Sequence, residues 1–356
     1  MAQRKSTPTR DIDAAGVLQA RVTIDDVARE AGVSKATVSR VLNRRDDLLT
    51  REITERVQAT IARLGYSPSP MAQALKRGRS RLIGLVVADV TNPFSVAVLR
   101  GAEKACRDAG YMVMLFNLGN DDLREREAIQ ALSSYQVEGF ILHTLGHDTT
   151  ALREATQRGK PVVLVDRRLG DAQLDLVGLD NAGAVRLAAG HLIDAGYREL
   201  LFVTESMKGV SSREERASAF RAFLGDPPAP CHGAVLECVA GDDAALDAAL
   251  QELKQRAGTR PPAVLTANAL ITLRIVAAAA RLGWSIGVDL GLAGFDDPEW
   301  AAFVGPGLTT IAQPTDDIGR LATACLIERI EGRPNPPRQI LLPGRLVVRG
   351  SSQAAL

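Results

Sequence analysis

From residue 82 onward, short apolar runs alternate with stretches of helix-forming residues. The runs are LIGLVVA, YMVMLF, EGFIL, PVVLVD, DLVGLD, ELLFVT, PAVLT and LGLAGFD, and most are separated by stretches such as VAVLRGAEKACRDAG and ITLRIVAAAARLG. Continuous apolar strands joined by helices are typical of parallel sheets that are covered on both faces. Because about 270 residues follow this pattern, more than one sheet needs, the sequence predicts an α/β body of two doubly wound parallel-sheet subdomains.

The preceding segment has a different pattern, which predicts a small all-α domain over residues 21–66. Thr23, Ser34 and Thr50 are suitable N-cap residues, and Gly32 and Gly65 are suitable helix stops. Three residues separate the first two helices, which suits a helix-turn-helix corner. Apolar residues at helical spacing predict the inward faces: Ile24, Val27, Ala28, Ala31, Val38, Val41, Leu42, Ile53, Val57, Ile61 and Leu64.

The remaining boundaries follow from composition. Residues 1–20 and 351–356 are expected to be tails, and residues 81–350 to form the α/β body. Residues 67–80 contain prolines and Gly78 around the short helix-forming stretch MAQALKR. A helix that short is marginal in water. We therefore expect a hinge helix that orders only when it docks against a partner.

The charges are distributed unevenly. Residues 1–81 contain 16 Lys and Arg against 9 Asp and Glu, whereas the rest of the chain has 27 against 33. A basic head on an acidic body suggests a polyanionic partner at one end. No apolar run approaches the ~20 residues of a membrane helix, and the first 20 residues lack the apolar core of a signal peptide. A cytoplasmic, nucleoid-associated protein is expected.

Patterns typical of enzymes and metal sites are absent from the sequence. It has no GxGxxG loop between a strand and a helix, no GxSxG nucleophile pattern and no HExxH pattern. His143 and His147 are four residues apart, but they follow a strand and have a glycine between them. The four scattered cysteines are expected to be reduced thiols. We therefore expect a binding protein with no catalytic residues, metal or cofactor. A transporter's solute-binding protein, the alternative, predicts a secretion signal and no basic head.

In combination, these features resemble the LacI family of bacterial transcription regulators. The motifs are VTIDDVAREAGVSKATVSRVLN, LGYSPSPMAQALKRGRSRLIGLVVADVTNPF, PVVLVDRR, ASAF, AGFDD, LTTIAQP and LVVRGS, and the resemblance covers residues 22–350. It implies a homodimer or tetramer on double-stranded, pseudo-palindromic operator DNA. It also implies a small effector that binds between the two lobes and controls whether the hinge helices pair on DNA.

Within the family, four stretches resemble the 2-ketogluconate-responsive repressors of pseudomonad-like bacteria. They are SYQVEGFILHTLGH, VDRRLGDAQLDLVGLDNAGAV, VTESMKGVSSREERASAF and AQPTDDIGR. The implied function is sequence-specific repression of a sugar-acid utilisation operon, with a sugar acid such as 2-ketogluconate as effector. A different carbohydrate, namely gluconate, 2-keto-3-deoxygluconate or a neutral sugar, remains the alternative.

The resemblance also assigns residues that bind DNA. Because Val38, Val41 and Leu42 are expected to face the core, Lys35, Ala36 and Arg40 face outward, and these match the family's base-reading positions. Leu75 matches the family's leucine that wedges into the minor groove. An ordinary capped surface helix is the alternative for the first three. Residues expected to contact phosphates or to cap helices are Thr23, Ser34, Thr37, Ser39 and Asn43.

Effector residues are expected just after the strands, because ligands of open parallel sheets bind beyond the carboxyl ends of the strands. Arg216 matches the family position whose guanidinium holds the ligand bidentately. The family usually has Asp at position 269 and Gly at position 219, where this chain has Ala. Losing a carboxylate near Arg216 and Arg213 favours an anionic ligand. For each residue a helix cap or ion pair is the alternative. The effector-binding candidates are Asp89, Phe94, Asp166, Ser212, Arg216, Asn268, Asp296 and Gln313.

Overall fold

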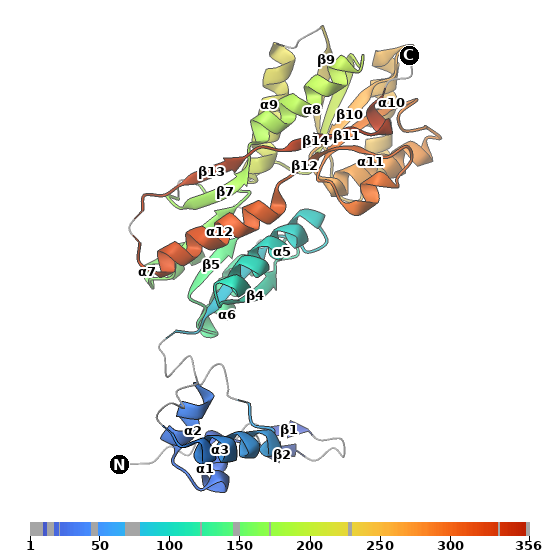
Figure 1. Ribbon diagram of the computed structural model, residues 1–356. Helices are drawn as coiled ribbons and strands as arrows, with labels where there is room; N and C mark the ends of the chain where they lie inside the picture. Colours follow the sequence, from blue (N-terminus) through green and yellow to red (C-terminus); the bar gives the residue numbers. More distant parts are fainter. Residues whose placement is uncertain are drawn as a thin grey trace. The chain divides into compact units, whose positions relative to one another are not determined.

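The chain forms two compact units, Met1–Ser80 and Arg81–Leu356, in the computed structural model (Figure 1). No helix within the described part of the chain is both long enough and apolar enough to span a lipid bilayer. The described residues are 10–12, 18–20, 22–43, 49–67, 79–121, 123–144, 150–170, 172–226, 230–333 and 335–353.

Three α-helices make up the core of the first unit within these residues. Thr23, Ser34 and Thr50 each accept a hydrogen bond from a backbone N–H in the first turn. Gly32 and Gly65 end their helices with left-handed φ values of 65° and 61°, which glycine adopts without a Cβ penalty. The predicted caps and stops are therefore confirmed. The helices are α1 (Ile24–Ala31), α2 (Lys35–Leu42) and α3 (Arg51–Leu64).

One valine from each helix meets in the centre of this unit. Val27, Val38 and Val57 are fully buried, and each contributes roughly 1.5–3 kcal/mol by leaving water. Ala28, Ala31 and Val41 complete the buried set, with partly buried neighbours around them. This small core fixes the orientation of α2.

Both segments predicted to be tails include described residues that make regular contacts. Arg10–Ile12 (β1) pairs antiparallel with Leu18–Ala20 (β2), and this local pairing satisfies backbone groups that a tail would leave to water. At the other end, Ser351 and Ser352 are fully buried, and their hydroxyls form hydrogen bonds with other residues of the second unit. Ser351 Oγ donates to the Leu292 carbonyl at 2.6 Å. Most of the predicted hinge, residues 68–78, lies outside the described residues.

The second unit contains two lobes, each built on a six-stranded sheet within the described residues. The first sheet has the order β13-β7-β6-β5-β3-β4 and is parallel throughout. The second has the order β14-β12-β11-β10-β8-β9, and its only antiparallel pair joins β14 to β12. The predicted fold class is thus confirmed. The first sheet comprises β3 (Leu82–Val87), β4 (Met112–Asn117), β5 (Gly139–Leu142), β6 (Val162–Val165), β7 (Asp175–Leu179) and β13 (Gln339–Leu342). The second comprises β8 (Glu199–Thr204), β9 (His232–Glu237), β10 (Ala263–Thr266), β11 (Gly291–Phe295), β12 (Thr309–Ala312) and β14 (Arg345–Val347).

Helices cover both faces of each sheet. In the first lobe, α5 and α12 pack on one face and α6 and α7 on the other. In the second lobe, α8 and α9 pack on one face and α10 and α11 on the other. The first-lobe helices are α5 (Pro93–Asp108), α6 (Arg124–Ser134), α7 (Thr150–Gln157) and α12 (Thr315–Ile330). The second-lobe helices are α8 (Asn181–Asp194), α9 (Ser211–Gly225), α10 (Asp243–Ala257) and α11 (Ala269–Arg281), with short 3-10 helices at Glu299–Ala302 and Gly350–Ser352.

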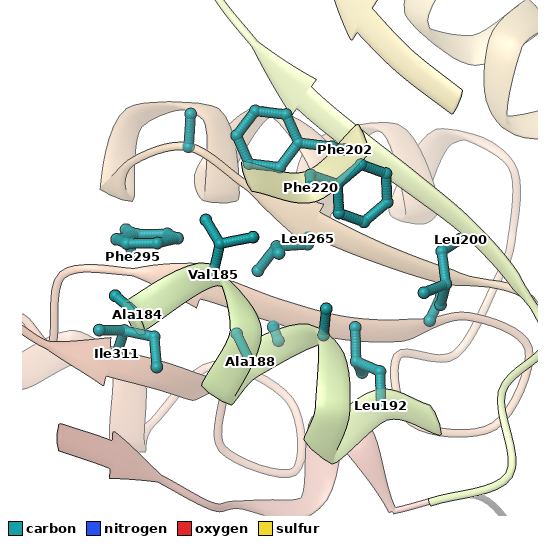
Figure 2. Close-up of a cluster of buried hydrophobic side chains, with 14 of the residues drawn as sticks. Ala184, Val185, Ala188, Leu192, Leu200, Phe202, Phe220, Leu265, Phe295 and Ile311 are labelled. Carbon is teal, nitrogen blue, oxygen red and sulfur yellow. The ribbon is translucent and has the colours of Figure 1, made fainter. Parts of the chain in front are cut away.

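The core of the second lobe shows how α8 and α9 pack on their sheet (Figure 2). Val185 and Leu192 of α8 are buried together with Leu265 of β10. Phe220 of α9 stacks on Phe202 of β8 with ring centroids 5.6 Å apart. Offset aromatic pairs of this kind add roughly 0.5–1.5 kcal/mol beyond their buried area. α9, which carries two of the effector candidates, is thereby fixed on the sheet.

Within the described residues the chain crosses between the lobes three times. It crosses after β7, after β12, and between β13 and β14. Each lobe therefore combines segments that are distant in the sequence. In the first lobe, α12 crosses α5 closely at two glycines: a Cβ on Gly101 would lie 2.2 Å from the Asp316 carbonyl oxygen, and one on Gly319 2.3 Å from that of Val98.

Candidate nucleic-acid interface and ligand cleft

The exposed face of α2 carries the predicted base-reading side chains. Lys35, Ala36 and Arg40 are exposed, whereas Val38 and Val41 point into the core. The predicted orientation of the helix is therefore confirmed. A short helix with small and basic residues on its outer face can enter the major groove of DNA.

The polar neighbours of these residues bond to their own helix. Ser34 Oγ accepts from the Thr37 backbone N–H at 3.2 Å and lies 3.0 Å from the Thr37 hydroxyl. Asn43 Nδ2 donates to the Ser39 carbonyl at 2.6 Å, and Thr23 forms a capping box with Asp26. Thr23, Ser34 and Asn43 are therefore helix caps in the free protein, and Thr37 and Ser39 are partners of the last two within α2.

Lys35 is held by an ion pair that DNA can replace. Its Nζ lies 2.6 Å from Asp25 Oδ1, and both side chains are more than half exposed. Exposed pairs contribute little to stability, so exchanging Asp25 for a base or phosphate costs little. The remaining predicted DNA contact, Leu75, lies outside the described residues.

The candidate effector residues converge where the two lobes meet in the second unit. Phe94 and Asp166 come from the first lobe, Gln313 follows β12 at a crossing, and Ser212, Arg216, Asn268 and Asp296 come from the second lobe. The cavity is lined by seven of the eight predicted residues: Phe94, Asp166, Ser212, Arg216, Asn268, Asp296 and Gln313.

Asp89 does not line this cavity. Its Oδ1 accepts from the Thr91 backbone N–H at 2.8 Å, and its Oδ2 accepts from Asn120 Nδ2 at 2.8 Å. Both contacts hold the loop between β3 and α5. Asp89 thus positions the start of the helix that carries Phe94.

Asp166 and Asp296 occupy matching positions in the two lobes. Each follows a central strand and has a left-handed backbone, with φ values of 65° and 72°. The Asp166 N–H donates to the Val177 carbonyl, and the Asp296 N–H to the Ile311 carbonyl, each at 3.0 Å. Non-glycine residues with this φ are uncommon and cluster at functional sites. One carboxylate from each lobe thereby lines the cavity.

Arg216 is buried and already bound to protein acceptors. Nε donates to Asn181 Oδ1 at 2.7 Å and Nη1 to the Ala267 carbonyl at 2.5 Å. The guanidinium carbon lies 4.2 Å from the centre of the Phe295 ring, and Nη2 lies 3.8 Å from Asp166 Oδ1. Because Nε is occupied, a bidentate grip on a ligand through that edge is not open in this arrangement.

Two carboxyl groups of the cavity differ in their electrostatic environment. Burial raises the pKa of Asp166, but the adjacent His143 ring and the charges of Arg216 and Arg167 outweigh it and hold this pKa far below its usual range. For Asp296 burial dominates and raises the pKa, despite Arg216 and hydrogen bonds from the Ala269 backbone and Gln313. Of these two carboxyl groups, Asp166 is therefore the one that stays ionised more readily.

The cavity also contains residues that the sequence analysis did not select. His143 Nε2 lies 3.3 Å from Asp166 Oδ2, and the ring packs edge-on against Phe94 with centroids 5.4 Å apart. Burial lowers the pKa of His143 and lowers that of Arg167 to about 10, so Arg167 stays charged near neutral pH. Both follow strand ends, the signal that found Asp166. The other additions to the lining are Asn92, Arg213 and Ala267.

The two lobes are closed over this cavity. Ser211 Oγ accepts from the Arg168 backbone N–H at 2.8 Å, and Arg168 Nη2 pairs with Glu215 at 2.5 Å. The space left for the centre of a water molecule is about 20 Å³, enough for roughly one water. A sugar-sized ligand therefore requires the lobes to separate or side chains to move.

Comparison with known proteins agrees with this architecture. Residues 23–69 match the model of bacterial regulatory proteins, lacI family, and residues 189–352 that of a periplasmic binding protein-like domain. The chain is 46% identical over 332 residues to the HTH-type transcriptional regulator PtxS of Pseudomonas plecoglossicida, covering 93% of this chain and 96% of the relative. It is 40% identical over 329 residues to the HTH-type transcriptional regulator KdgR of Bacillus subtilis (strain 168), covering 92% and 97%.

A solved structure extends the likeness to a DNA complex. The lac repressor dimer bound to operator and the anti-inducer ONPF matches with a TM-score of 0.79 and 25% identity, covering 94% of this chain and all of that one. The relatives named above are transcriptional regulators. The chain therefore belongs to the LacI family and is a DNA-binding transcriptional regulator.

Proposed function

We propose that this regulator is a repressor of a sugar-acid utilisation operon, and that a sugar acid such as 2-ketogluconate is its effector. The effector binds in the cleft between the lobes. The observation that carries this proposal is the set of three arginines, Arg167, Arg213 and Arg216, that line one small cavity. Buried guanidinium groups favour carboxylate-bearing ligands over neutral ones.

The start of α11 supports an anionic effector. Ala269, where the family usually has Asp, is fully buried and contributes only a backbone N–H, which Asp296 Oδ2 accepts at 3.1 Å. A carboxylate here would add a second negative charge beside Asp296. Its absence reduces repulsion of an acid. The likeness of the sequence to 2-ketogluconate-responsive repressors points the same way.

The same proposal includes a cytoplasmic homodimer on a near-palindromic operator. Two copies of α2 would occupy two half-sites, and paired hinge helices would contact the centre. Val239, Leu273 and Phe303 of the second lobe are exposed apolar side chains, of the kind that a second copy covers in a homodimer. The effector changes the arrangement of the two lobes because it binds one arrangement more tightly than the other, and the difference in affinity sets the size of the shift.

Thermal melting of the full chain with candidate ligands tests the effector. We expect 2-ketogluconate to raise the melting temperature more than gluconate, 2-keto-3-deoxygluconate or neutral sugars do, because a ligand of the native state stabilises it by mass action. Operator binding with and without that ligand then shows whether it releases DNA. A neutral sugar that stabilises the protein most would contradict the sugar-acid assignment.

Removing a base-reading side chain should weaken specific binding in particular. For Arg40→Ala or Lys35→Ala we expect roughly a 10- to 100-fold loss of affinity for the operator and a much smaller loss for random DNA. Titrations at several salt concentrations measure both. Arg63→Ala, which removes an exposed charge from α3 instead, is the control. Equal losses on both DNAs would contradict base reading and indicate phosphate contact.

Truncating the hinge leucine should weaken the operator complex and reduce DNA bending together. Leu75→Ala removes the wedge that unstacks the central base step, and we expect about a tenfold or greater loss of operator affinity. Gel mobility of circularly permuted operator fragments measures the bend. A variant that binds and bends operator like the wild type would exclude the wedge role.

A further inference from the structure

Arg167 lies in the cavity with hydrogen-bonding capacity unused. It is the second residue after β6, and its side chain is only 7% exposed. Nη1 donates to the Thr144 carbonyl at 3.1 Å. Its Nε is buried without a hydrogen-bond partner among the described residues. A buried charged donor left unmatched costs free energy until an acceptor reaches it.

The carboxylate of Asp166 does not serve as the hydrogen-bond acceptor for Arg167 Nε. Asp166 Oδ2 lies 3.4 Å from Arg167 Nε, too poorly aligned for a hydrogen bond. The same oxygen accepts from Ser212 Oγ at 2.9 Å and lies near His143. The other oxygen faces Arg216. One carboxylate is thus shared among several donors, and Arg167 is left under-compensated.

The other cationic groups of the cavity are better matched. Arg216 has its Nε and Nη1 on protein acceptors. Arg213 Nη1 donates to the Ser206 carbonyl at 2.8 Å, and its Nη2 lies 3.1 Å from Glu205. Of the three guanidinium groups in the cavity, that of Arg167 is therefore the one whose charge is least well compensated by hydrogen bonds and salt bridges among the described residues.

We propose that Arg167 binds the carboxylate of the effector and thereby selects sugar acids over neutral sugars. This assignment rests on the proposed function, that the cleft binds a sugar acid. The carboxylate replaces the missing partner of Nε, and the rest of the sugar extends toward the second lobe.

An unmatched acceptor in the lining of the same cavity suits the hydroxyl groups of such a ligand. Gln313 Nε2 donates to Asp296 Oδ1 at 2.7 Å, whereas its Oε1 is buried without a partner among the described residues. A hydroxyl group donates to this oxygen. A neutral sugar satisfies Gln313 but leaves Arg167 unpaired, and a site built around a buried polar group rejects ligands that leave the group unpaired.

The test uses two ligands that differ at one carbon. Fructose has a CH2OH group where 2-ketogluconate has its carboxylate. Calorimetric titration of the full chain measures both affinities for the wild type, Arg167→Gln and Arg167→Lys. Arg158→Gln, which removes an exposed charge from the same lobe, is the matched control.

We expect the wild type to prefer the acid by about 100-fold. Arg167→Gln should lose roughly 10- to 100-fold of acid affinity while its fructose affinity stays within about threefold. Arg167→Lys retains the charge but lacks the planar fork, and about a tenfold loss is expected. The control should bind both ligands like the wild type.

The contradicting outcomes are distinct. If the wild type prefers the acid and the Arg167 variants keep that preference, Arg167 does not bind the carboxylate, whereas the proposed function stands. Equal losses for acid and fructose indicate a structural role and also contradict the assignment. A wild type that binds fructose as tightly as the acid contradicts the sugar-acid effector itself. Should Arg167→Gln not fold, unchanged acid affinity in Arg167→Lys would overturn the assignment.

Discussion

Replacing Arg216 with alanine is expected to abolish the effector response while the protein still binds operator. The guanidinium bonds Asn181 and the Ala267 carbonyl within the second lobe and lies 3.8 Å from Asp166 across the cleft. Removing one partner of a buried charged network costs about 3–5 kcal/mol, which corresponds to at least ~100-fold in affinity if it is lost on binding. The DNA-binding helices belong to the other unit.

Operator release as a function of 2-ketogluconate concentration measures this effect. Arg221→Ala, which removes an exposed arginine from the same helix, should respond like the wild type. Arg216→Lys should restore little, because an ammonium group cannot reach both acceptors and stack on Phe295. An Arg216→Ala protein that is folded, binds operator and still responds at wild-type concentrations would exclude Arg216 from the effector site.

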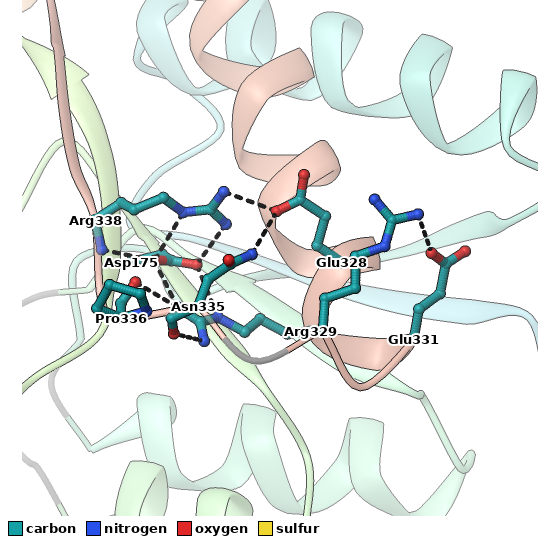
Figure 3. A network of polar contacts seen from close by, with 8 residues as sticks. Asp175, Glu328, Arg329, Glu331, Asn335, Pro336 and Arg338 are labelled. Carbon is teal, nitrogen blue, oxygen red and sulfur yellow. Dashed lines mark hydrogen bonds and ion pairs between the residues drawn. The ribbon is translucent and has the colours of Figure 1, made fainter.

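Replacing Asp175 with alanine is expected to destabilise the second unit by about 3–5 kcal/mol. The side chain is 1% exposed and accepts from Arg329 Nη2 at 3.0 Å and Arg338 Nη2 at 3.1 Å (Figure 3). It also accepts from the Arg338 backbone N–H at 2.8 Å. These contacts tie the end of α12 and the start of β13 to β7. Without the carboxylate, two arginines lose their shared partner.

Urea unfolding gives this free energy, and its pH dependence supplies an independent check. Burial raises the pKa of Asp175, but hydrogen bonds from Arg329 and Arg338 outweigh burial and lower it. The stabilising effect is therefore complete above the unfolded pKa of about 3.9 and is lost as the pH falls through the folded value. Asp175→Asn should reduce this acid-side loss. A variant as stable as the wild type from pH 3 to 7 would contradict the role.

The sequence pattern identifies strands that consist of a continuous apolar run, including the edge strand β4, and misses strands that lack such a run, including the interior strand β12. VVLV of β6 is buried at every position, so its apolar run stands out. In contrast, β9 is an edge strand whose side chains are exposed or half-buried, and its sequence HGAVLE has no continuous apolar run. The edge strands β13 and β14 were missed for the same reason. α12 was missed as well, since its buried face is made largely of small residues such as Gly319, Ala322 and Cys325.

The sequence was sufficient to predict those residues of the candidate site that directly follow a strand or lie near its end. Seven of the eight chosen residues line the cavity because parallel strands deliver their carboxyl ends to one edge. Arg167 follows the same strand end as Asp166, but the sequence does not state the left-handed φ of Asp166 that precedes it in the cavity lining. That turn sends the next side chain into the cavity. Asp89 lies outside the cavity lining, and its carboxylate accepts a hydrogen bond from Asn120, which is distant in the sequence.

The last two strands have a consequence for how the protein is made. β13 pairs with β7 and β14 pairs with β12, so residues 339–347 complete the edge of both sheets. Until the ribosome has released this segment, β7 and β12 each present a row of unpaired backbone groups, which invites association with other chains. The two lobes therefore cannot mature one after the other during synthesis. Chains truncated before residue 339 should be found mainly in aggregates, even though each lobe would lack only one of its strands.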